Sequence, residues 1–186
     1  MKKKFKEGYW ITGVKYPTRR AELILTLRLL SNAKWQEVVY TSTVKNFTPG
    51  LNGEYGIHYT LHYAVELILE DLCLDDFIKS KQYPYKQIGW WLKSREEAEN
   101  LLGVAILIDK LYESANPNHD EIKNKQYLAS SYLDELRKAS KKALNAFMDN
   151  ENDNKEFIDY LNKGEDNINK NYIKLTQSND TSETRI

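Results

Sequence analysis

The sequence predicts an all-α fold, a single-domain bundle of about five to six helices. Apolar residues recur mostly at three- and four-residue spacing over long segments. Residues that start or stop helices stand between those segments. The chain has 186 residues, of which 41% are hydrophobic, which suits one core. We expect a helical domain over residues 1–176, with an irregular, flexible arm at 1–16, and a disordered tail at 177–186.

The first helix is expected at residues 18–31. Pro17 disfavours a helix upstream of it, and the hydroxyl of Thr18 is the expected N-cap. Basic residues between Lys2 and Arg20 make this end of the chain locally positive, which is typical of a solvated leader. Residues 35–44 follow, and their β-branched and aromatic residues leave helix or strand open, with helix as our choice.

The middle of the chain combines a loop with a long helix. Residues 46–56 contain Pro-Gly and Asn-Gly pairs, which favour turns. Residues 57–79 carry apolar side chains at helical spacing and are expected to form an amphipathic helix. Alternation within residues 57–63 leaves room for a strand at its front.

The next start signal is the capping box formed by Ser94 and Glu97. The helix that follows should end near Ser114, and its apolar run at 101–108 predicts a central position in the bundle. Gly103 within that run would allow a close backbone approach. Two more helices are expected, at residues 118–148 and 155–162, separated by a polar break.

Charge and cysteine content restrict the function classes. Lys+Arg and Asp+Glu both number 27, so no net field attracts nucleic acid or an anionic membrane. Cys73 is the single cysteine, which excludes an internal disulfide and favours a reducing compartment. No apolar stretch approaches the about 20 residues of a membrane span, and no apolar segment of a signal peptide follows Met1. We therefore expect a cytoplasmic protein.

The pattern closest to a metal site is incomplete. His58, His62 and Glu66 stack at i, i+4 and i+8 on one helix face. Tyr59 stands where a zinc-protease helix needs glutamate, and His119 lies far away in the sequence. Neither a nucleophile elbow nor a phosphate-binding glycine loop is present. We expect no enzyme activity, metal or cofactor, and a metal-binding protein or enzyme using these residues remains the alternative.

An acidic strip is predicted on the helix at 57–79, since residues 64–77 contain five carboxylates and no lysine or arginine. Exposed together, these carboxylates would steer a basic partner toward the chain. The alternative is a solvated helix face neutralised by Lys79, Lys81 or the lysines of residues 138–142. The acidic strip consists of Glu66, Glu70, Asp71, Asp75 and Asp76.

Residues 19–112 contain a set of short motifs. They are Arg20, Leu27-x-x-Leu30-Ser31, Trp35-Gln36, Leu74-Asp75-Asp76, Tyr83-Pro84-x-x-x-Ile88-Gly89-x-x-Leu92 and Glu96-Glu97, with the apolar helix after them. With these motifs the stretch resembles small bacterial immunity proteins of contact-dependent and other polymorphic toxin systems. The segment after residue 116 departs from the compact members of that family.

The resemblance implies a protein that binds a cognate toxin and occludes its active site. If that toxin is a basic nuclease, the acidic strip would mimic nucleic-acid phosphates. Tyr85, Trp90 and Trp91 would anchor the contact where they are exposed. A helical module that self-associates is a further alternative.

Overall fold

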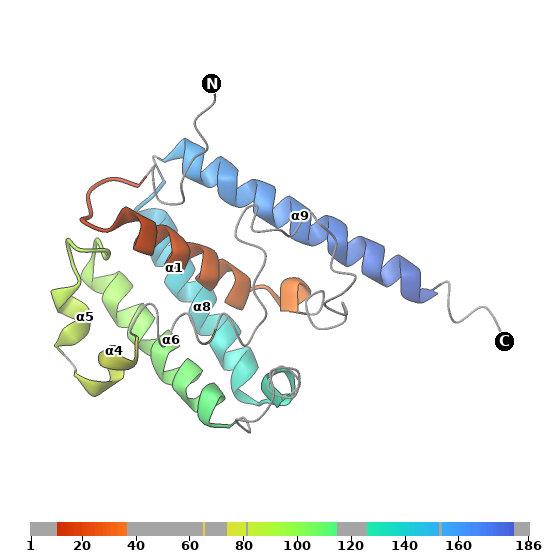
Figure 1. Ribbon diagram of the computed structural model, residues 1–186, viewed down its shortest axis with the longest axis horizontal. Coiled ribbons are helices and arrows are strands. Elements are labelled where there is room, and N and C mark those ends of the chain that lie inside the picture. The colour runs from red at the N-terminus through yellow and green to blue at the C-terminus, as the bar shows by residue number, and fades with distance from the viewer. Residues whose placement is uncertain are drawn as a thin grey trace.

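In the computed structural model the chain has an all-α fold. The structure describes residues 11–36, 65, 74–80, 82–114, 126–152 and 154–180, and every regular element in these ranges is a helix (Figure 1). Short helical turns at 33–36 and 126–129 accompany the named helices. The helices are α1 (Pro17–Leu30), α4 (Asp75–Lys79), α5 (Tyr83–Lys86), α6 (Arg95–Glu113), α8 (Tyr132–Asp149) and α9 (Lys155–Asp180).

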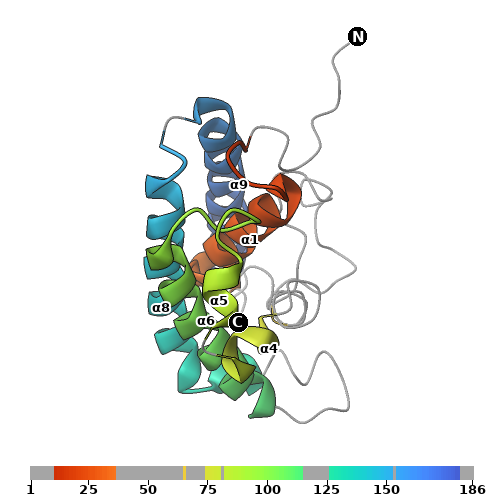
Figure 2. The same cartoon turned by 90° about the vertical axis from the view of Figure 1, so that its left-hand side faces the viewer.

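The long helices pack as neighbours around a shared core. Helix α8 lies against both α6 and α1, while α4 and α5 pack together on one side of α6 (Figures 1 and 2). Helix α9 follows α8 after a short turn and is joined to α1 by Arg28, which donates a hydrogen bond to the carbonyl of Leu161 at 2.6 Å. Apolar side chains of α1, α6, α8 and the start of α9 form one cluster.

Helix α1 is the most buried of these helices. Every residue from 23 to 30 is buried, so this stretch is enclosed on all sides. The expected bounds were correct within one residue, but the expected cap was wrong. Tyr16 is the N-cap residue and makes no side-chain capping bond, while Pro17 is the first helical residue and Thr18 is exposed. Proline suits this place because its missing N–H has no partner there anyway.

Helix α6 begins as predicted and packs differently from the prediction. Ser94 Oγ accepts a hydrogen bond from the Glu97 amide at 3.2 Å, and Ser114 is the C-cap. Helix α6 packs against α8, α4 and α5, but its apolar run is not buried on every side, because Ile106 is 39% exposed. The expected close approach at Gly103 is wrong, since a Cβ there would meet nothing within 4 Å.

The C-terminal helices differ from expectation at both ends. A short helix at 126–129 ends before Ser130, whose hydroxyl accepts a hydrogen bond from the Tyr132 amide, and α8 starts afresh there. Serine favours such breaks because its hydroxyl competes for backbone groups. Helix α9 continues to Asp180 instead of ending at residue 162, so residues 177–180 are helical. Docking of its first turns on the core, through Phe157 and Leu161, lets the helix propagate.

Several expectations fall outside the described residues. The loop at 46–56, most of the segment at 37–44 and most of the helix at 57–79 lie there, as does Cys73. At residues 74–79, the described part of that expected helix, Leu74 lies in a turn and α4 begins at Asp75. These residues therefore form a separate short helix. Within the ranges that the structure describes, no helix combines the length and apolar character needed to cross a membrane.

Candidate docking surface

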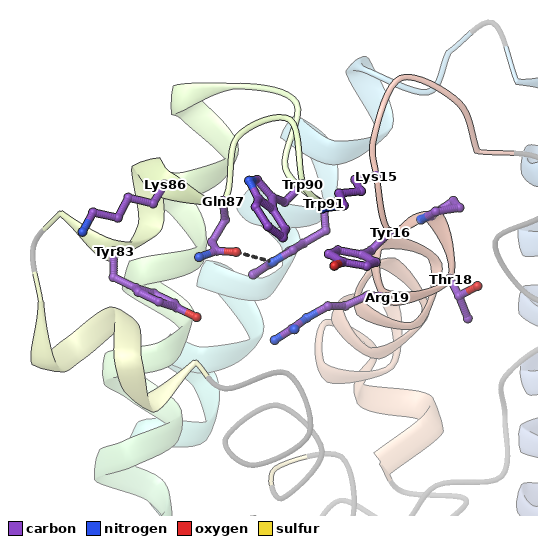
Figure 3. Close-up of a pocket in the computed structure, with 10 residues that line it drawn as sticks. Lys15, Tyr16, Thr18, Arg19, Tyr83, Lys86, Gln87, Trp90 and Trp91 are labelled. Atoms are coloured by element: carbon purple, nitrogen blue, oxygen red, sulfur yellow. Dashed lines mark hydrogen bonds between the residues drawn. The ribbon is translucent and has the colours of Figure 1, made fainter.

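A pocket of about 790 Å³ lies between the start of α1 and the loop that joins α5 to α6 (Figure 3). Its described lining combines aromatic rings with cationic side chains. The lining residues are Lys15, Tyr16, Pro17, Thr18, Arg19, Tyr83, Lys86, Gln87, Trp90 and Trp91.

The loop at 87–92 fixes two neighbouring tryptophans in opposite environments. The Gln87 carbonyl accepts hydrogen bonds from the amides of Trp90, Trp91 and Leu92 at 3.0, 3.2 and 3.1 Å. This tight turn passes through Gly89 at φ +85°, a backbone conformation that glycine adopts at little cost. As a result the Trp90 side chain is 44% exposed, whereas Trp91 is 1% exposed.

The segment before α1 is hydrogen-bonded to this loop. The amides of Lys15 and Tyr16 donate to the carbonyls of Gly89 and Trp90 at 3.1 and 2.7 Å. The rings of Tyr16 and Trp90 then lie 5.6 Å apart between centroids. Lys15 Nζ lies 4.0 Å from the centroid of the Trp90 ring, a cation–π distance. Tyr16 is 43% exposed, so the Tyr16–Trp90 pair presents two large rings to solvent.

Trp91 forms the floor of the site. Its ring stacks on Phe77 of α4 at 5.6 Å, and its indole N–H donates to Gln87 Oε1 at 2.8 Å. The Arg19 guanidinium lies 4.9 Å from the same ring. In Figure 3, Arg19 and Tyr83 reach toward one another across the pocket from α1 and α5. The floor therefore joins α1, α4 and α5.

A buried ion network holds the loop from behind. Arg20 donates to Glu97 at 2.7 and 2.9 Å, to Glu151 at 2.7 Å and to the Trp91 carbonyl at 3.1 Å. Lys93 Nζ pairs with the same Glu151 carboxylate at 2.6 Å. The side chains of Arg20, Glu97 and Glu151 are at most 2% exposed. A satisfied network of this kind is rigid, so it fixes the loop relative to α1 and α6.

The described lining of the pocket carries positive charge. Lys15, Arg19 and Lys86 carry cationic groups, and no carboxylate occurs among the described residues that line it. The first turn of α1 adds no acidic residue, and its backbone amides contribute a positive helix end. These groups can bind an anionic group while the rings pack against apolar or planar surfaces.

The aromatic residues singled out in the sequence have three different environments. Trp90 is exposed and belongs to the pocket, whereas Trp91 is buried and offers no outward surface. Tyr85 is half-buried, with the Arg95 guanidinium 5.0 Å from its ring and its hydroxyl 3.5 Å from a Glu99 carboxylate oxygen. Of the three expected anchors, only Trp90 therefore presents a large exposed ring at the pocket.

The acidic strip is described only at its end. Glu66, Glu70 and Asp71 lie outside the described residues. Asp75 is paired with Lys79, and the hydrogen bond from this lysine holds the pKa of the Asp75 carboxyl below its ordinary value. Neutralisation by the protein's own lysine is what the alternative interpretation of the strip expects.

The metal-site hypothesis cannot be placed on the structure. His58, His62, Glu66 and His119 all lie outside the described residues. In the part of the chain that is described, no three His, Cys, Asp or Glu side chains are grouped as ligands for a metal ion.

Sequence reasoning missed the residues that complete the pocket with Trp90. Tyr16 and Lys15 were assigned to a solvated arm, and Lys86 had no role. The available sequence feature was the concentration of positive charge before residue 20, but nothing in the sequence placed it beside the loop at 87–92. Compared with protein-family models, with curated proteins and with solved structures, the chain matches none of them.

Proposed function

We propose that this chain acts by binding another protein through a surface centred on the Tyr16–Trp90 pair. The observation that carries the proposal is that a rigid loop holds the Trp90 ring 44% exposed beside a pocket, while its neighbour Trp91 is buried. Tryptophan, tyrosine and arginine are the residue types that dominate binding energy at protein interfaces. All three types meet at this surface.

The area involved is large enough to matter for affinity. A tryptophan side chain contributes up to about 250 Å² of surface, so the exposed part of Trp90 corresponds to about 110 Å². At about 25 cal/mol per Å², covering it contributes about 2 to 3 kcal/mol to binding. Because the loop is already ordered by hydrogen bonds, little conformational entropy is lost when a partner covers the ring.

The resemblance of residues 19–112 to immunity proteins supplies the class of partner. On this basis the partner is a cognate toxin domain, and the chain is a non-catalytic cytoplasmic inhibitor that occludes the toxin's active site. The surface at Trp90 supports protein binding in general, and the resemblance supports the toxin in particular.

Co-expression tests this function in cells. If the gene immediately upstream encodes a secreted protein, the C-terminal domain of that protein is the toxin candidate. We expect that domain to arrest growth when it is expressed alone and the wild-type chain to restore growth. The Trp90→Ala variant should protect less. Tyr112→Ala is the matched control, because Tyr112 is 39% exposed on α6 and lies outside the described pocket lining.

Failure to protect, with the wild-type chain folded and abundant, would contradict the toxin assignment. Equal protection by the wild-type chain and the Trp90→Ala variant would contradict the assignment of the surface. Circular dichroism of the purified variants checks that each of them is folded.

A further inference from the structure

We infer that the pocket beside the Tyr16–Trp90 pair receives an acidic side chain of the protein partner, an aspartate or glutamate that stands next to an apolar residue. This inference rests on the proposed function and adds to it the chemistry of the partner. It also states the charge of the partner's contact surface. A partner that binds the acidic strip would be basic, whereas the partner surface that enters this pocket is acidic.

The charges on the pocket are the first argument. Lys15 and Lys86 both line it, and no described carboxylate forms a salt bridge with either of them. Arg19 adds a third cationic group, which is held against the Trp91 ring. The described lining contains cationic groups and no carboxylate, so this part of the pocket complements a negative group.

The position of the Lys15 ammonium group is the second argument. The centroids of the Trp90 and Tyr16 rings lie 4.0 and 5.5 Å from Nζ, so the rings cover part of the group. Since an ammonium group has three N–H donors, the uncovered side is free to bind a carboxylate oxygen.

The aromatic walls are the third argument. The Tyr16–Trp90 pair is exposed at the pocket, so an apolar residue next to the acidic one would cover these rings. A volume of about 790 Å³ accommodates such a short segment of a partner chain. The pocket thus fits a contact in which a carboxylate orients the partner and an apolar residue supplies affinity.

Three short peptides test the inference on the full chain. Each peptide has phenylalanine at its centre, flanked on both sides by glutamates, glutamines or lysines. Binding is followed by NMR through the indole N–H signal of Trp90, which a Trp90→Phe variant identifies. We expect the glutamate peptide to bind about tenfold more tightly than the glutamine peptide. We also expect the lysine peptide to show no saturable shift.

The lysines of the pocket are tested with a matched pair of double variants. Lys15→Gln/Lys86→Gln should lower the affinity for the glutamate peptide about five- to tenfold, which is the size expected for the loss of two partly exposed ion pairs. Lys138→Gln/Lys155→Gln removes the same charge from exposed positions of α8 and α9 and should leave affinity unchanged. Raising the ionic strength from about 0.05 to about 0.5 M should weaken binding of the glutamate peptide more in the chain that keeps Lys15 and Lys86 than in the variant that lacks both lysines.

Several results would overturn the inference. They are equal binding of the three peptides, tighter binding of the lysine peptide, and unchanged binding to the Lys15→Gln/Lys86→Gln variant. Displacement of the glutamate peptide by an equal concentration of inorganic phosphate would identify a general anion site and also overturn it. None of these results bears on the docking function itself, which is measured separately by the effect of Trp90→Ala on protection from the toxin.

Discussion

Replacing Arg20 with methionine is expected to destabilise the fold strongly. The guanidinium donates to Glu97, to Glu151 and to the Trp91 carbonyl, and all of these contacts are buried. Methionine fills similar space but leaves two buried carboxylates with fewer partners. Removal of one partner from a buried ion pair typically costs about 3 to 5 kcal/mol.

This cost translates into a measurable change in thermal stability. For a chain of this size each kcal/mol lowers Tm by about 2 to 4 °C, so Arg20→Met should lower Tm by about 6 to 20 °C. Thermal and urea unfolding followed by circular dichroism measure the change. Near-UV circular dichroism should change as well, because the Arg20 contact holds the Trp91 carbonyl.

Two further variants distinguish the effect of the buried Arg20 network from the effect of removing any arginine. Arg95→Met breaks an exposed pair with Glu99 and should leave Tm essentially unchanged. Arg20→Met/Glu97→Gln should lose less stability than the sum of the single changes, because one uncompensated buried carboxylate is removed. A loss below about 1 kcal/mol in Arg20→Met would refute the reasoning, since such a value is typical of exposed pairs.

Further predictions concern packing and titration. Gly164→Ala should lower Tm, because its Cβ would lie 2.8 Å from the Cζ atom of Arg28 and the guanidinium that joins α9 to α1 would have to shift. Gly103→Ala, which meets nothing within 4 Å, should preserve or raise Tm, and urea unfolding compares the two variants. Trp91→Ala should cost about 3 to 5 kcal/mol in equilibrium unfolding, because the side chain is buried. The pKa of Asp75 lies below its ordinary value of 3.8, so Lys79→Met should raise it in an NMR pH titration. Because the folded-state pKa is the lower one, the small stabilisation from this pair is present above pH 3.8 and is lost as the pH falls through the lowered pKa.

Local signals in the sequence predicted where the helices lie better than they predicted how the helices pack. The cap at Ser94 and the bounds of α1 follow from residues within one turn of each helix end, so they were found. The burial of α1 on all sides over residues 23–30 was not predicted, because local spacing does not show how many neighbours a helix has. The length of α9 was missed because its first turns are stabilised by contacts with the core, which a polar local sequence does not reveal.

The candidate site depends on contacts between distant parts of the chain. Arg20 and Glu151 are 131 positions apart, and no local spacing relates them. Likewise Lys15 reaches Trp90 only because the segment before α1 is hydrogen-bonded to the loop at 87–92. The sequence identified Trp90 and Trp91 as equal candidates, since neighbouring tryptophans look alike until a turn directs one outward. The sequence therefore named Trp90 as a candidate anchor, while the pocket beside it required the fold.

The affinity of the purified chain for the proposed toxin domain, measured by calorimetry with the wild-type chain and with Trp90→Ala, tests the central claim most directly. We expect Trp90→Ala to weaken binding by about 2 kcal/mol, or about thirtyfold, with an unchanged Tm. Tyr112→Ala should bind like the wild-type chain. Equal affinity of the wild-type chain and Trp90→Ala would contradict the assignment of this surface.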